Sequence, residues 1–88
     1  MNVSEKIKLA LRITSNAFDD EIDDLIESCD RDLQIAGIVR IKDDDPLILR
    51  ARILYAKWHF GYADAGESYM RSYEMLKVSL RLAGDYNV

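Results

Sequence analysis

The densest apolar stretch of the chain runs from Asp45 to Gly61, DPLILRARILYAKWHFG, and predicts a helix at the centre of the fold. Asp45 is placed to cap its N-terminus through the carboxylate. Pro46 suits the first helical position, where a missing N–H costs nothing, and Gly61 supplies the stop.

Two thin polar seams divide the surface of this predicted helix. At about 100° per residue, Arg50 and Lys57 share one seam, while Arg52 and His59 share the other. Two apolar faces remain. The wider face carries Leu47, Ile48, Ala51, Leu54, Tyr55 and Trp58, and the narrower one carries Leu49, Ile53, Ala56 and Phe60. A helix that is apolar on two sides needs neighbours on two sides.

Two further helices are expected before this one. A short helix over residues 3–13 begins with Asn2 or Ser4 as the cap, and a polar break at residues 14–16 (Thr, Ser, Asn) offers a cap for the next helix. From Ala17 to the stop at Gly37, apolar residues recur every three or four positions. They are Phe18, Ile22, Leu25, Ile26, Cys29, Leu33 and Ala36.

The opposite face of this second helix is strongly acidic. Beyond the acidic first turn, this face carries five more carboxylates, and Arg31 is the only basic residue of the helix that offsets their charge. The five are Asp23, Asp24, Glu27, Asp30 and Asp32. Such a face is either solvated or meets a basic partner, and solvation is the simpler interpretation.

Residues 38–44 are expected to form a short extended connection and not a sheet strand, because nothing nearby offers a pairing partner. A fourth amphipathic helix follows over residues 67–83, with Gly84 as its stop and a four-residue tail. Its core stripe is Tyr69, Tyr73, Leu76, Leu80 and Ala83. A second stripe, Met75, Val78 and Leu82 with Arg71 beside it, should be exposed, as either a subunit contact or ordinary surface.

The pattern therefore predicts an all-α fold, a small bundle of about four helices around a central apolar helix, in one domain over residues 1–88. Chains this short bury a modest core, so a partner subunit can add stability. No signal-peptide pattern and no apolar run near 20 residues is found, which predicts a cytosolic protein or part of a soluble assembly, without a membrane.

Charge is divided unevenly along the chain. Residues 1–45 hold twelve acids and six bases, net −6, and residues 46–88 hold four acids and six bases, net +2. An acidic chain is a poor non-specific ligand of phosphate backbones, which argues against nucleic-acid binding. Two regions of opposite sign can, however, bring copies of the chain together head to tail.

Candidate catalytic chemistry is sparse, and we expect no enzyme activity, cofactor or metal. His59 has no identifiable partner and is expected to be structural, and Cys29 follows the core periodicity, as a buried small hydrophobe does. The acidic runs 19–24 and 43–45 lack calcium-loop spacing and are explained by helix capping and solubility. A helix-turn-helix that reads DNA is unlikely on an acidic domain.

With these residues laid out, the whole chain resembles the small head–tail connector proteins of tailed bacteriophages. The resemblance rests on three segments in order: KIKLALRIT at 6–14, AFDDEIDDLIESCDRDL at 17–33 with its Leu25–Ile26 pair, and DPLILRARILYAKWHFG at 45–61. A final amphipathic helix follows in the expected place.

The resemblance implies a homo-oligomeric ring of a tailed phage or prophage that docks under the portal after DNA packaging and provides part of the DNA channel. The ring would act at the head–tail interface of a virion assembled in the host cytoplasm. Its partners would be the portal and the next head-completion or tail protein, with DNA only as passing cargo. Under this reading Asp23, Asp24 and Glu27 either line the channel or meet the next subunit. The alternative function is a small soluble helical adaptor that binds one partner protein as a monomer or dimer.

Overall fold

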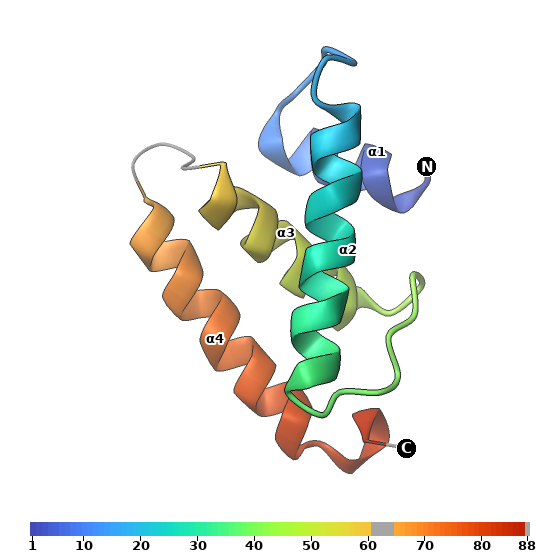
Figure 1. Ribbon diagram of the computed structural model, residues 1–88, viewed down its shortest axis with the longest axis vertical. Helices are drawn as coiled ribbons and strands as arrows, with labels where there is room; N and C mark the ends of the chain where they lie inside the picture. The colour runs from blue at the N-terminus through green and yellow to red at the C-terminus, as the bar shows by residue number, and fades with distance from the viewer. Residues whose placement is uncertain (61–64, 88) are drawn as a thin grey trace.

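The computed structural model describes residues 1–60 and 65–87 and contains four α-helices (Figure 1). They are α1 (Val3–Leu11), α2 (Asp19–Ile35), α3 (Pro46–His59) and α4 (Gly66–Leu82), followed by a 3-10 turn, η2 (Gly84–Tyr86). No strand occurs in these described ranges, and residues 38–44 form an irregular connection. The predicted small all-α bundle is confirmed.

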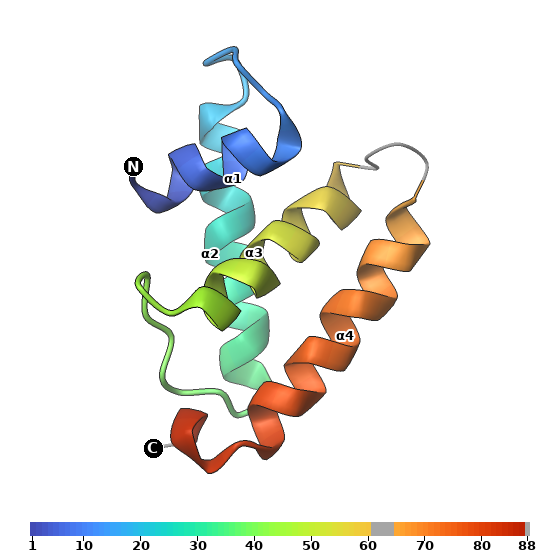
Figure 2. The same cartoon turned by 180° about the vertical axis from the view of Figure 1, so that it is seen from behind.

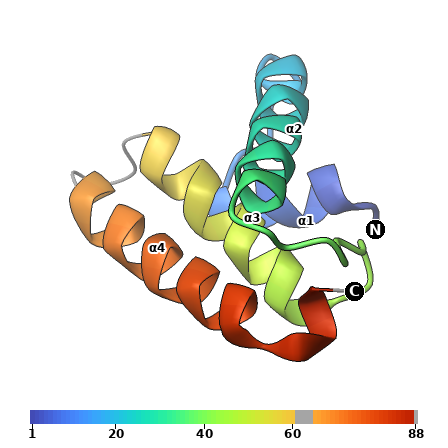
Figure 3. The ribbon, with the colours of Figure 1, turned by 60° about the horizontal axis from the view of Figure 1, so that its bottom comes forward.

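The central position of α3 is confirmed as well, because α3 packs against each of the other three α-helices. The helices α1 and α4 flank it on two sides, and α2 crosses it on a third (Figures 1 and 2). Seen from below, α2 stands on one side of the layer that α1, α3 and α4 form (Figure 3). The fourth side of α3 is therefore left without a helix.

The start of α3 follows the predicted chemistry. The Asp45 carboxylate accepts a hydrogen bond from the Leu47 N–H at 2.8 Å, and Pro46 occupies the first turn. The helix ends at His59, with Phe60 as its C-terminal cap. The predicted stop at Gly61 lies outside the described residues.

The two apolar faces of α3 pack into two separate core clusters, as its pattern predicted. The first cluster joins α2, α3 and α4 through Cys29, Leu33, Ile38, Ile48, Ala51, Tyr73 and Leu80. The second joins α1, α2 and α3 through Ile7, Leu11, Ile22 and Ala56. One assignment was wrong: Leu47, placed on the wider face, is 46% exposed, because it lies at the edge of that face, about 60° around the helix from the exposed Arg50.

Both ends of α1 are closed by local hydrogen bonds. Asn2 is its cap, as one of the two predicted candidates, and it forms a capping box with Glu5. At the other end Arg12 adopts a left-handed conformation, with φ at 60°, and its N–H donates to the Leu9 carbonyl. An L-residue with a side chain adopts this conformation at some cost.

The ends of α2 agree only partly with the prediction. The cap expected from Thr14, Ser15 or Asn16 is wrong: Phe18 holds the cap position without a side-chain hydrogen bond, and Ser15 instead accepts from the nearby Ala17 N–H.

The predicted stop of α2 at Gly37 is confirmed. Gly37 has φ at 97°, and the next residue, Ile38, donates its N–H to the Leu33 carbonyl. Ile38 and Leu33 are both buried, which is the hydrophobic contact that accompanies such a helix end.

The C-terminal tail, for which the sequence predicted no contacts, packs back onto the bundle through Tyr86. The Tyr86 carbonyl accepts hydrogen bonds from the N–H groups of Val39 and Arg40, and the Tyr86 hydroxyl donates to Asp45 at 2.8 Å. Its ring packs against the first core cluster. The turn η2 therefore fastens both ends of the connection between α2 and α3, beside which it lies in Figure 3.

Candidate functional site

The helix α2 is tied to each of its neighbours through its carboxylates. The Ser4 hydroxyl of α1 donates to Asp23 at 2.6 Å, and the Tyr73 hydroxyl of α4 donates to Asp32 at 2.6 Å. From α3, Arg52 reaches Asp30. These contacts fix which side of each neighbouring helix is turned toward α2.

Arg52 forms the most buried of these links. Its guanidinium donates from Nε and Nη2 to the two oxygens of Asp30, at 2.9 and 2.8 Å, and from Nη1 to Asp43 at 2.8 Å. Arg52 was expected on a polar seam, and it is only 4% exposed. A charge in the middle of the densest apolar helix needs a partner, and this signal in the sequence could have pointed to such a pair.

Asp32 was expected on the open acidic face, and this is wrong. It is half-buried between α2 and α4, where it accepts from Tyr73 and from Lys77 Nζ at 3.0 Å. Burial opposes its ionisation, but the two donors outweigh burial and hold the pKa of Asp32 below its ordinary value. Burial and the bond to Asp32 together raise the pKa of Tyr73.

Four carboxylates of α2 form what we call the acidic ridge: Asp20, Asp23, Asp24 and Glu27. All four are exposed, and among them Asp23 has one oxygen engaged by Ser4. The expectation of a solvated acidic face therefore holds for Asp23, Asp24 and Glu27 within this chain, but not for Asp30 and Asp32.

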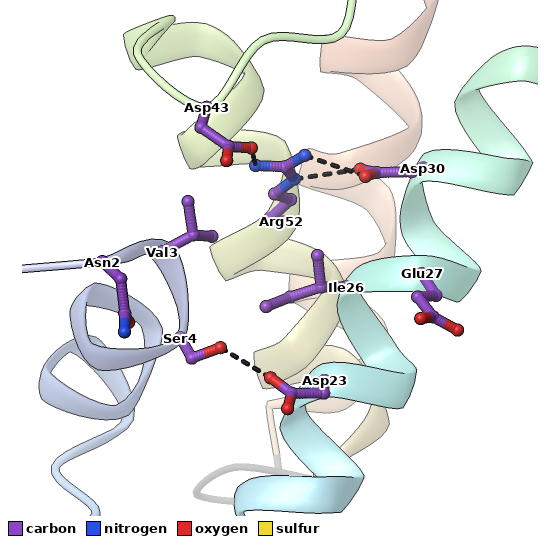
Figure 4. A pocket seen from close by; sticks show the side chains of 9 residues that line it. All are labelled: Asn2, Val3, Ser4, Asp23, Ile26, Glu27, Asp30, Asp43 and Arg52. Carbon is purple, nitrogen blue, oxygen red and sulfur yellow. Dashed lines mark hydrogen bonds and ion pairs between the residues drawn. The ribbon is translucent and has the colours of Figure 1, made fainter.

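An open pocket lies beside the ridge, between α1, α2 and the start of α3 (Figure 4). Nine side chains line it: Asn2, Val3, Ser4, Asp23, Ile26, Glu27, Asp30, Asp43 and Arg52. Four are carboxylates, and the single guanidinium already bonds two of them. The lining favours a cation, such as a lysine or arginine side chain, over an anion.

The outer stripe of α4 is exposed, as predicted. Met75 and Leu82 are each 73% exposed and Val78 is 42% exposed, with Arg71 also exposed. The core stripe of α4 meanwhile packs inward through Tyr73 and Leu80. The structure thus leaves one side of α4 apolar and open.

Neither Cys29 nor His59 is part of a catalytic arrangement. Cys29 is fully buried, as predicted, and burial raises the pKa of its thiol to about 12. His59 is exposed, with its ring 4.2 Å from the rings of Tyr55 and Trp58, and partial burial lowers its pKa. Within residues 1–60 and 65–87, no three His, Cys, Asp or Glu side chains are grouped as metal ligands.

The described helices form a small all-α fold with an exposed acidic ridge on α2 and an exposed apolar stripe on α4. None of its described helices is long and apolar enough to cross a membrane.

The chain belongs to the phage connector protein family, whose model matches residues 4–87. Searches of curated proteins and of solved structures found no match. The resemblance to head–tail connectors is confirmed, and membership gives the protein a general role as a structural connector of the phage particle.

Proposed function

We propose that this protein docks under the portal as a ring of identical subunits after DNA packaging, and that the ring forms part of the DNA channel. The observation that carries the proposal is the family match over residues 4–87, which includes all four α-helices and η2. Its partners are further copies of itself, the portal and the next head-completion or tail protein. The ring works at the head–tail interface of the virion and is assembled in the host cytoplasm.

The outer stripe of α4 supports a docking role. Met75, Val78 and Leu82 lie at a spacing that aligns them along one side of the helix, and Arg71 extends the stripe by one turn. We assign this stripe to contact with a neighbouring subunit or a partner protein, since an apolar row on an otherwise polar surface gains from being covered.

The acidic ridge has two possible roles in such a ring. Lining the channel, Asp23, Asp24 and Glu27 would repel passing DNA and keep it from adhering. Facing a neighbour, they would pair with a basic surface of the next subunit. Charge reversal at these three residues separates the roles: lost assembly favours the subunit contact, while intact rings with impaired DNA passage favour the channel.

A second candidate is an adaptor that binds one partner protein as a monomer or dimer. The single exposed stripe on α4 favours it, because one such helix face is enough for one partner.

Native mass spectrometry of the purified protein over rising concentration tests the two candidates. A closed ring of several subunits is the result expected for the connector. A strict monomer or dimer, both alone and with purified portal added, would move the assignment to the adaptor.

A further inference from the structure

We propose that the acidic ridge of α2 docks against a basic face centred on Arg50 of a second copy of this chain, so that copies associate head to tail. The inference rests on the proposed ring and deepens it, because it names the two surfaces that join neighbouring subunits. It also assigns the ridge to a subunit contact and not to the channel.

The position of Arg50 follows from that of Arg52. Arg52 is turned toward α2, where it bonds Asp30. Arg50 precedes it by two residues, and at 100° per residue its side chain leaves α3 about 160° away from that of Arg52. Arg50 is exposed and, by this offset, lies on the side of α3 turned away from α2. Seen from that side, no described helix passes in front of α3 (Figure 2).

In α1, too, a residue two positions from those that bond α2 points away from α2. Ser4 bonds Asp23 of α2, and Lys8 pairs with Asp19 at 2.7 Å. Lys6 lies midway between them in sequence and therefore points about 160° away from both. Lys6 is exposed.

In α4 the residue at the equivalent place is apolar. Tyr73 and Lys77 both bond Asp32 of α2. Met75 lies midway between them, points about 160° away, and is 73% exposed. We call the surface made by Lys6, Arg50 and Met75 the back face: two cations from neighbouring helices with an apolar side chain beside them.

No acid from α3 weakens the charge of the back face, because residues 46–59 contain none. The opposite is true of the acidic ridge. Asp20 and Glu27 each lie three and four residues from the adjacent pair Asp23 and Asp24, which places all four along one side of α2. Ile22 and Cys29 bury the other side of that helix, so the ridge faces outward.

The two surfaces lie on opposite sides of the molecule along its shortest axis, which measures 18 Å. Viewed down that axis, α2 is in front of α3 in Figure 1 and behind it in Figure 2. A single partner cannot cover both surfaces at once. The contact is therefore heterologous, and repeated contacts of that kind close into a ring when the rotation permits.

Charge complementarity favours a second copy over DNA as the occupant of the back face. The chain carries a net charge of −4, which disfavours the approach of a DNA backbone. Another copy supplies four carboxylates on one side of α2, which are complementary in charge to Lys6 and Arg50.

The test is the concentration dependence of assembly, measured by native mass spectrometry, for the wild type and three variants. Arg50→Glu should raise the concentration needed for assembly by about tenfold or more, since it places like charges in contact. Arg40→Glu makes the same charge change at an exposed position of the loop after α2 and should assemble as the wild type does. Circular dichroism checks that both variants are folded.

The decisive measurement is made on a mixture of two charge-reversed variants. A variant with Asp24→Lys and Glu27→Lys should fail to assemble alone, and so should Arg50→Glu. An equimolar mixture of the two should assemble, because the reversed ridge of one matches the reversed back face of the other, and their remaining surfaces are native.

Each outcome decides between the surface assignment and the ring itself. Assembly of Arg50→Glu at wild-type concentrations would overturn the inference and leave the ring standing. A mixture that stays unassembled would do the same. A wild type that remains monomeric, both alone and with purified portal added, would overturn both this inference and the proposed function.

Discussion

Arg52 and Asp30 share two hydrogen bonds, at 2.9 and 2.8 Å, across the interface between α3 and α2. Removing either member should have unequal effects. Asp30→Ala leaves a buried guanidinium without its main partner and should lower the free energy of unfolding by about 3 kcal/mol. Arg52→Met replaces the charge by an apolar chain, and we expect a loss of only about 1 kcal/mol.

Urea denaturation followed by circular dichroism measures both changes. Asp24→Ala is the matched control, because it removes an exposed aspartate of the same helix and should change stability by no more than about 0.5 kcal/mol. Equal losses for Asp30→Ala and Arg52→Met would contradict the view that the stranded charge carries the cost.

Gly37 provides a backbone test. Its φ of 97° is poorly accessible to a residue with a side chain, so Gly37→Ala should destabilise the protein by about 1 kcal/mol or more. No clash with the rest of the chain contributes, since no heavy atom beyond Gly37 and its two neighbours in sequence lies within 4 Å of an added Cβ. Gly84→Ala is the control: it also has open space, but its φ is not positive, and we expect a much smaller change in the midpoint of thermal unfolding.

Tyr86 should stabilise the loop between α2 and α3. Tyr86→Phe removes only the hydrogen bond to Asp45 and should lower the free energy of unfolding by about 1 kcal/mol. Tyr86→Ala also removes the ring from the first core cluster and should lower it by about 3 kcal/mol. Hydrogen exchange at the N–H groups of Val39 and Arg40 should accelerate in Tyr86→Ala, and unchanged protection there would contradict the role of η2 as a fastener.

Asp32 makes stability depend on acid pH. Because its pKa is lower in the folded protein than its ordinary value of 3.8, its stabilisation is complete above that value. As the pH falls below 3.8, the unfolded chain takes up the proton first and the stabilisation is lost. Asp32→Asn should therefore lose less stability than the wild type when the pH is lowered from about 5 to about 3.

Tyr73→Phe checks the cause of this effect. It removes one of the two donors to Asp32 and keeps Lys77, so its pH dependence should fall between those of the wild type and Asp32→Asn. Urea denaturation at a series of pH values gives the comparison, and identical slopes for all three proteins would contradict the assignment.

The outer stripe of α4 should matter for binding and not for folding. Met75→Gln together with Leu82→Gln changes two side chains that are 73% exposed, so the melting temperature should stay nearly unchanged. Assembly or portal binding should weaken, as judged by light scattering and by co-sedimentation with purified portal. Unchanged association in both assays would leave the stripe as ordinary surface.

Sequence periodicity predicted what depends on near neighbours along the chain. Pro46, the Asp45 cap and the two apolar faces of α3 all follow from residues within one helix, and so does the burial of Cys29. Arg52 was missed because its burial depends on a partner 22 residues away, and a helical wheel treats every charged residue as exposed. Tyr86 was missed for the same reason, since it meets Asp45 across 41 residues.

The carboxylates of α2 likewise show that periodicity within one helix does not reveal contacts with other helices. Asp23, Asp24 and Glu27 were correctly expected to be open, whereas Asp32 on the same helix bonds Tyr73 of α4. One helix of period 3.6 cannot present all its acids to one side, and which of them turn inward is decided by the crossing of α2 and α4.

Because Cys29 is buried, the rate at which its thiol is labelled can measure local opening of the core. A thiol with no exposed surface and a pKa near 12 is almost entirely unreactive toward alkylating reagents at neutral pH. A second cysteine placed on the acidic ridge could therefore carry a fluorophore alone in the native protein. Cys29 would itself become labelled only when the packing between α2 and α4 opens, so its labelling rate would record how often a subunit loosens, in solution or within an assembly.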